Sequence, residues 1–204
     1  MALDVICSGA SDAAVVSIEM PDAISPADPG VLGTKADGGA LALDIDGLVS
    51  RHVLIQAMTG GGKSRALRKL LELALAGGMA VVVLDIEGEF DTLRDVFPEV
   101  VVIGDVGADL PLTLASVADV AKIALRNGTS VVVQLRSAEN PAAVVTAWLE
   151  ALLASPESLW RPLLIAIDEA QSFAPEGRRS DSRAAVEALL QKGRKRGFTA
   201  ALAT

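Results

Sequence analysis

The stretch HVLIQAMTGGGKS, residues 52–64, decides the fold of this 204-residue chain. It begins with an apolar run typical of a buried strand, continues into three consecutive glycines and ends in Lys63-Ser64, where a helix is predicted to begin. A glycine-rich turn between a strand and a helix lets successive backbone amides point inward around phosphate oxygens, where a Cβ would obstruct the approach. The stretch therefore predicts a phosphate-binding loop.

The residues of this loop suit ATP with Mg²⁺. Lys63 is expected to reach the β- and γ-phosphates, the Ser64 hydroxyl to ligate Mg²⁺, and the helix N-terminus to add favourable partial charge. Ala57 stands where such loops usually have their first glycine, and its methyl group is small enough to be tolerated there. The alternative is a glycine-rich turn with a chance Lys-Ser pair, which the flanking strand and helix disfavour. The predicted nucleotide-binding residues are Thr59, Gly60, Gly61, Gly62, Lys63, Ser64 and Arg65.

A second signal is LLIAIDEAQ, residues 163–171, an apolar run that ends in two acids. Such a strand delivers carboxylates to its C-terminal edge, where α/β sheets bind ligands. Asp168 is expected to hold the Mg²⁺ shell through water, and Glu169 to polarise the attacking water. An apolar strand followed by acids is common as plain structure, but the upstream loop favours catalysis. A glutamate after the aspartate favours an ATP-hydrolysing motor over a nucleotide kinase or a switch GTPase.

A third signal is VVVLDIEGEF, residues 81–90, another buried strand that ends in acids. Asp85 is predicted to act at the catalytic site, and Asp85 and Glu89 are both expected to face the nucleotide edge. The alternative is a solvated turn with Gly88 at positive φ.

Short apolar runs alternate with helical patterns from Arg51 onward, which predicts an α/β fold of three layers around a mainly parallel sheet. The predicted strands are 53–58, 80–85, 100–103, 130–135, 163–168 and 197–203. The predicted helices are 63–76, 90–96, 115–126, 141–154 and 181–195.

The two ends of the chain differ from this core. Residues 1–30 are interpreted as an irregular lead-in or the remnant of a small β element, with the core domain over 31–204. Weak strand signals occur at Ala14–Ile18 and Ala40–Ile45. The last predicted strand runs into the final residue without a cap or turn, so the core is expected to be truncated at its C-terminal end.

Charge is spread unevenly along the chain. Eighteen basic and 26 acidic residues give a net charge of −8, which argues against coating nucleic acid through bulk charge. Residues 1–50 hold one basic and eight acidic residues, whereas residues 171–204 hold seven basic and three acidic ones. The basic stretch 191–197 ends a predicted helix, where cations stabilise the helix dipole and add solubility. The alternative is that this stretch has a function: one of its arginines senses phosphate or acts between subunits, or its basic side chains face DNA.

The composition indicates a cytoplasmic protein. One cysteine excludes an intramolecular disulfide framework and fits a reducing compartment, and one cysteine with one histidine cannot form a Cys/His zinc site. The longest apolar runs are far shorter than the ~20 residues of a membrane span. The start of the chain lacks the basic region of a secretory signal.

Taken together, these motifs resemble the HerA/FtsK superfamily of ring-forming P-loop ATPases, closest to the HerA branch. The resemblance covers about residues 31–204. The matching segments are VLG at 31–33, LVSRHVLI at 48–55, MTGGGKS at 58–64, DIEGEF at 85–90, DEAQSFAP at 168–175 and GRKRGF at 193–198.

The resemblance implies a RecA-like P-loop core in a hexameric, DNA-translocating ATPase, often working with a nuclease or another effector. By this resemblance Arg51 is the candidate arginine finger that reaches a neighbour's γ-phosphate, and Arg194 is the rival candidate. The ATP–Mg²⁺ site would be formed by Lys63, Ser64, Asp85, Asp168 and Glu169.

The chain also departs from the family pattern. Gln171 stands where histidine is common, and only about 50 residues precede the core, so the family's N-terminal barrel would be shortened or missing. The family's sensor glutamine would follow Thr204, where this sequence stops.

The leading hypothesis is the ATPase motor of a HerA-like DNA translocase or helicase that grips the DNA backbone and hydrolyses ATP at subunit interfaces. The alternatives are a conjugation- or secretion-type pump, and a non-translocating nucleotide-binding switch for a defence effector.

Overall fold

The computed structural model describes residues 2–8, 13–19, 31–35, 37–42, 44–49, 51–58 and 61–204, with the backbone alone for the first two ranges. The strands are β1 (Ala2–Ser8), β2 (Ala13–Glu19), β3 (Val31–Lys35), β4 (Ala40–Ala42), β5 (His52–Gln56), β6 (Ala80–Asp85), β7 (Val101–Gly104), β8 (Leu110–Pro111), β9 (Val131–Gln134), β10 (Leu163–Ile167) and β11 (Phe198–Ala203). The α-helices are α1 (Ile45–Leu48), α2 (Lys63–Ala76), α3 (Val117–Asn127), α4 (Pro141–Leu153) and α5 (Asp181–Lys192). The 3₁₀ turns are η1 (Asp91–Asp95), η2 (Glu157–Leu159), η3 (Ala170–Ser172) and η4 (Gly193–Arg196).

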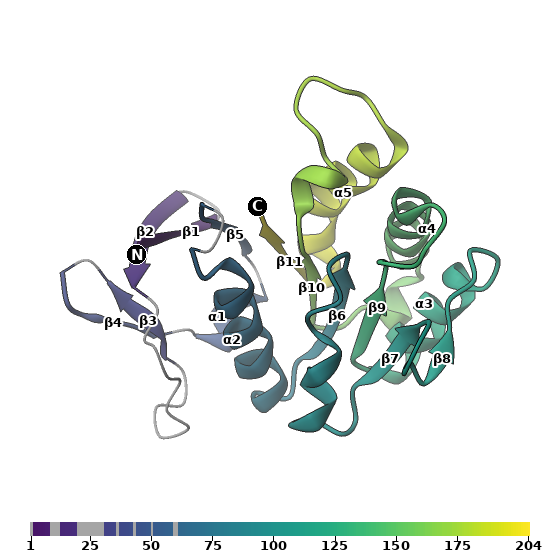
Figure 1. Ribbon diagram of the computed structural model, residues 1–204, viewed down its shortest axis with the longest axis horizontal. Helices are drawn as coiled ribbons and strands as arrows, with labels where there is room; N and C mark the ends of the chain where they lie inside the picture. The colour runs from purple at the N-terminus through teal and green to yellow at the C-terminus, as the bar shows by residue number, and fades with distance from the viewer. Residues whose placement is uncertain are drawn as a thin grey trace.

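The described strands form one eleven-stranded sheet in the order β4-β3-β2-β1-β5-β11-β10-β6-β9-β7-β8 (Figure 1). From β5 to β8 every neighbouring pair is parallel. The strands from β1 to β4 extend the sheet with antiparallel pairs, and β1 pairs with β5. The sheet is therefore mainly parallel, as predicted.

Helices cover both faces of the parallel part. Alternate residues along each strand enter two separate cores: Val81 and Val83 pack with α2, whereas Val82 and Leu84 pack with α3, α4 and α5. Burial on both faces explains why these strands are continuously apolar in the sequence. The predicted three-layer α/β architecture is confirmed.

Most predicted elements are present. All six predicted core strands occur within two residues of their expected bounds. The helix predicted at 90–96 is the 3₁₀ turn η1, and the helix predicted at 181–195 ends at Lys192 and continues as η4. The weak strand signals at Ala14–Ile18 and Ala40–Ile45 correspond to β2 and to the shorter β4. Within the described ranges, no helix is both long enough and apolar enough to cross a membrane.

Candidate active site

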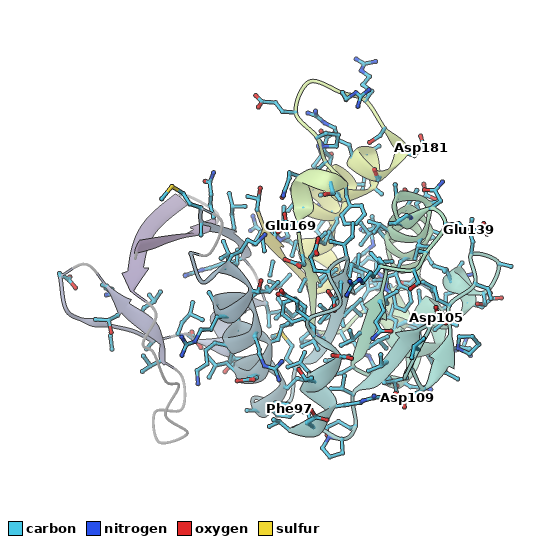
Figure 2. All side chains as sticks on the ribbon, in the orientation of Figure 1. Phe97, Asp105, Asp109, Glu139, Glu169 and Asp181 are labelled. Carbon is cyan, nitrogen blue, oxygen red and sulfur yellow. The ribbon has the colours of Figure 1, made fainter. Side chains whose placement is uncertain are left out.

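Four neighbouring parallel strands, β5, β11, β10 and β6, end at one edge of the sheet. The glycine loop follows β5, Thr204 follows β11, Asp168 and Glu169 follow β10, and residues 86–90 follow β6. Parallel strands share a direction, so these segments meet at this carboxyl edge, where α/β sheets bind ligands. Figure 2 shows Glu169 at the carboxyl edge and Phe97, which precedes β7, at the opposite amino edge.

The geometry of the loop requires two of its glycines. The Gly61 amide donates a hydrogen bond to the Met58 carbonyl (2.7 Å). A Cβ on Gly61 would lie 2.7 Å from that carbonyl oxygen and 2.8 Å from the Ala57 Cβ, both too close for ordinary contact. Gly62 has φ +84°, in the left-handed region that favours glycine. The loop therefore turns tightly into the start of α2.

The first turn of α2 presents backbone donors to the loop. Ala66 donates the first hydrogen bond of the helix, to the Gly62 carbonyl (2.9 Å). The amides of Lys63, Ser64 and Arg65 therefore precede the helical hydrogen-bond ladder. No acidic residue lies in this described first turn to offset the helix dipole. Free amides and the dipole together make the end of α2 suitable for an anion.

The Lys63 ammonium lies beside the two acids that follow β10. Its Nζ donates a hydrogen bond to Glu169 Oε1 and lies 4.0 Å from Asp168 Oδ1. The other carboxylate oxygen of Glu169 accepts a hydrogen bond from Gln171 Nε2. Glu169 has φ +48° and is the one non-glycine residue with positive φ in the described part of the chain. Such conformations cost about 1–3 kcal/mol and concentrate at functional sites.

Asp168 is a buried carboxylate whose Oδ1 has a long ion pair with Lys63 and accepts no hydrogen bond from the described residues. Its side chain is 1% exposed, and its Oδ1 has no hydrogen-bond partner among the described residues. Burial raises the pKa of Asp168 to about 6. Lys63 opposes this rise, whereas the negative charges of Asp85, Glu89 and Glu87 add to it. A cation beside Asp168 would relieve the cost of keeping it ionised.

These features fit Mg²⁺ carried with a nucleotide. Oδ1 of Asp168 is a hard anionic ligand without a hydrogen bond, and Ser64 lines the pocket next to Lys63. The described residues contain no group of three or more His, Cys, Asp or Glu side chains placed to hold a metal ion. Mg²⁺ bound with a nucleotide needs only one or two protein ligands, because phosphates and waters supply the others. The donor set therefore suits a metal that arrives with its phosphates.

Asp85 lies at the carboxyl end of β6, where its side chain is held by the loop that follows the strand. Its carboxylate is buried, with Oδ1 accepting from the Gly88 amide (2.7 Å) and Oδ2 from the Phe90 amide (2.9 Å). Burial raises the pKa of Asp85, and these backbone hydrogen bonds oppose the rise. Gly88 has φ +77°, as the turn alternative expected. Asp85 thus closes the loop after β6, and Glu87 and Glu89 of that loop reach the pocket.

The pocket at the carboxyl edge has a volume of about 610 Å³, within the usual range for small-molecule sites. The predicted site residues that line it are Gly62, Lys63, Ser64, Arg65 and Glu169. Residues not assigned to the site from sequence that also line it are Met58, Glu87, Gln171 and Thr204. The predicted contacts of Thr59 and Gly60 lie outside the described residues.

The two candidate finger arginines lie at the amino edge, away from this pocket. Arg51 directly precedes β5, and Arg194 lies in η4 directly before β11. His52, at the start of β5, contacts α5 and β11, because its Nε2 lies 2.9 Å from the Leu190 carbonyl and its Nδ1 accepts from the Ala200 amide (3.0 Å). Burial lowers the pKa of His52, and nearby Arg194 lowers it further. The structure therefore does not bring either arginine to the pocket at the carboxyl edge of its own chain.

Residues 31–193 match the protein family described as "Helicase HerA, central domain". The match spans well over half of the chain, so the chain belongs to this family, and the resemblance drawn from its motifs is confirmed. No curated protein matches the chain in sequence. Membership implies a P-loop ATPase, in agreement with the loop, the helix start and the acids described above.

Proposed function

We propose that this member of the HerA central-domain family is the ATP-hydrolysing motor domain of a DNA translocase that acts as a ring. The observation that carries the proposal is the Lys63–Glu169 contact beside Asp168, in a pocket at the N-terminus of α2. A lysine held by carboxylates at an anion-binding helix end is positioned to exchange those carboxylates for a phosphate.

Each residue of the pocket has a role in this proposal. The glycine loop, the first amides of α2 and Lys63 bind the ATP phosphates. Ser64 and Asp168 would hold Mg²⁺, which neutralises negative charge on the phosphates when bound. Glu169 orients the attacking water and accepts its proton on a carboxylate oxygen. Asp85 acts through its loop, which places Glu87 and Glu89 at the pocket.

Hydrolysis between copies of the chain is supported by the position of the arginines. Arg51 and Arg194 are exposed at the amino edge. The length of β5, roughly 15–20 Å, separates that edge from the pocket. Arg51 or Arg194 can then reach only the γ-phosphate of a neighbouring copy, whereas Arg65 lines the pocket of its own chain. Head-to-tail contacts of this kind form a ring when the rotation between copies closes, and the family resemblance leads us to expect a hexamer.

The basic segment before β11 is proposed to contact the DNA backbone. Lys192, Arg194 and Lys195 are exposed there, and the Arg196 guanidinium lies 5.0 Å from the centre of the Trp160 ring. Lysine and arginine bind phosphates whatever the base sequence, as translocation requires. A nuclease or another effector acting on the moved DNA is the expected partner, in the cytoplasm of a prokaryote.

Two substitutions in the full-length protein test the ATPase assignment. Lys63→Ala removes the ammonium that binds phosphate, so ATP binding and turnover are both expected to be lost. Glu169→Gln keeps the shape of the side chain but removes the proton acceptor. ATP binding is therefore expected to persist while kcat falls about 10²- to 10⁴-fold. ATP hydrolysis that persists in Lys63→Ala would contradict the assignment.

Added DNA separates the motor from its alternatives. A translocase is expected to hydrolyse ATP faster with DNA, and less so at high salt, because phosphate contacts release counterions. ATPase activity that DNA leaves unchanged would support a nucleotide switch. Co-purification of DNA with covalently attached protein would support a pump.

A further inference from the structure

Side-chain donors occupy both carboxylate oxygens of Glu169. Oε1 accepts from Lys63 Nζ, and Oε2 accepts from Gln171 Nε2. An ionised carboxylate can only accept hydrogen bonds, so Gln171 must turn its amide nitrogen, not its oxygen, toward Glu169. The contact therefore fixes the orientation of both side chains.

The two donors, Lys63 and Gln171, differ in how strongly a phosphate attracts them. Lys63 carries a positive charge and stands at the helix end where phosphates are proposed to bind, so a phosphate competes with Glu169 for it. Gln171 is neutral and has no comparable attraction to phosphate. When Lys63 turns to the nucleotide, Oε1 of Glu169 becomes free to accept a proton, whereas Oε2 stays with Gln171.

The local backbone directs both side chains into the pocket. Glu169 has φ +48°, and its carbonyl accepts from the Ser172 amide (2.8 Å), which closes the turn η3. Ala170 within this turn and Phe173 directly after it are buried in the core and hold the turn in place. Glu169 and Gln171 both line the pocket. Glu169 and Gln171 are two residues apart on a tight turn that the core holds in place. This spacing puts the side chain of Gln171 beside that of Glu169.

Gln171 lies at the surface, outside the two buried cores of the described structure. Its side chain is exposed, and Glu169 is its only hydrogen-bond partner in the described part of the chain. Exposed side chains outside the core contribute little to stability. The contact is therefore more readily explained by the site than by the fold.

We infer that Gln171 is a positioning residue: its amide holds Oε2 of Glu169, so that Oε1 faces the attacking water once Lys63 has turned to the nucleotide. The inference rests on the proposed ATPase function and assigns to that site a residue outside the expected set. Glu169 remains the catalytic residue, and Gln171 acts only through it.

The test replaces the amide without changing the length of the side chain. Gln171→Met, in the full-length protein, removes the donor and is expected to lower kcat roughly 10- to 100-fold. The KM for ATP, ATP binding and the melting temperature are expected to stay unchanged. Gln171→His retains a ring N–H donor and is expected to restore most of kcat. The control Glu157→Met puts a methionine at an exposed position of η2, outside the pocket and the basic segment, and should leave kcat unchanged.

A second measurement needs no turnover. Carbodiimide labelling of carboxyl groups, located by mass spectrometry, reports how accessible each carboxylate is. In the nucleotide-free protein, Gln171→Met frees one oxygen of Glu169, so labelling of Glu169 is expected to rise. Labelling of Glu176, an exposed residue of the segment before α5, serves as the internal reference and should not change.

Three outcomes would overturn the inference alone, leaving Lys63→Ala inactive and the ATPase assignment intact. They are an unchanged kcat in Gln171→Met, a Gln171→His variant no better than Gln171→Met, and a Gln171→Met variant that melts earlier and loses ATP binding together with kcat. Wild-type protein that hydrolyses no ATP would overturn the inference and the proposed function together.

Discussion

Keeping the buried Asp168 ionised costs free energy, and the positive charge of Lys63 offsets only part of this cost. Burial raises its pKa from 3.8 to about 6, so the folded chain keeps a proton that the unfolded chain releases between these values. The folded state binds more protons over this window, and its stability must therefore fall as the pH rises through it. The full shift corresponds to about 3 kcal/mol.

Asp168→Asn is expected to remove this pH dependence. The neutral amide needs no proton, so the variant should be more stable than wild type at pH 7 by up to about 3 kcal/mol. It should also lose Mg²⁺-dependent hydrolysis. Urea unfolding at pH 4 and pH 7, in EDTA, measures the difference. The control Asp105→Asn, at an exposed carboxylate, should keep the wild-type profile. An Asp168→Asn variant with the wild-type pH profile would contradict the account.

At the residue scale, the sequence predicts which residues meet but not what each side chain binds. Lys63, Asp168 and Glu169 converge because they follow parallel strands that end at one edge. Asp85 follows such a strand too, yet its carboxylate closes its own loop. The spacing of Gln171 from Glu169 becomes informative only with the positive φ of Glu169, which sequence patterns do not reveal. The catalytic roles themselves stay predictions.

At the scale of the elements, the link between β5 and α2 depends on Gly61. A methyl group there would lie within 3 Å of the Met58 carbonyl and the Ala57 Cβ. Gly61→Ala is expected to displace the loop at a cost of about 1–3 kcal/mol. ATP affinity should then fall about 10- to 100-fold, as measured by nucleotide titration.

The matched control for this substitution is Gly107→Ala. Unlike Gly61, Gly107 has positive φ, but no atom lies within 4 Å of the added Cβ, and the residue does not line the pocket. It should lower stability slightly and leave ATP affinity unchanged. Equal loss of ATP affinity in both variants would show that general strain, and not the shape of the loop, is responsible.

The elements that were predicted well are those with strong patterns. The strands β5, β6, β7, β9, β10 and β11 have continuous apolar runs, and α2 to α5 have clear helical patterns between them. The strands β1, β3 and β8 and the helix α1 were not predicted, because short or outer elements have weak patterns and depend on their pairing partners. The boundary at residue 30 stays a prediction.

At the scale of the whole molecule, the pocket and the candidate fingers lie on opposite edges of one sheet. Arg51→Ala should therefore bind ATP normally but hydrolyse it slowly, by about 10³-fold or more if the arginine stabilises the transition state. Mixed with Lys63→Ala, it should regain activity, because a mixed ring contains interfaces with both residues intact. The controls are each variant alone and a mixture of Lys63→Ala with Arg179→Ala. The rate of ATP hydrolysis is measured for each of them.

Recovery of activity in the first mixture above the sum of its components would support action between copies. No recovery with Arg51→Ala, but recovery with Arg194→Ala, would assign the finger to Arg194. Arg179 lies in the exposed segment before α5, so its alanine variant alone should match wild type.

β11 runs from the amino edge to the carboxyl edge, between the strand of the glycine loop and the strand of the two acids. The arginines of η4 precede it, and Thr204 follows it, with its amide donating to the Ile55 carbonyl (3.0 Å) and its carbonyl accepting from the Ala57 amide (3.2 Å). An extended backbone is close to its maximum length and hardly stretches. In the proposed motor, we therefore expect a force that DNA exerts on η4 to be transmitted along β11 to the glycine loop. Such a force would change the affinity of the site for ATP directly.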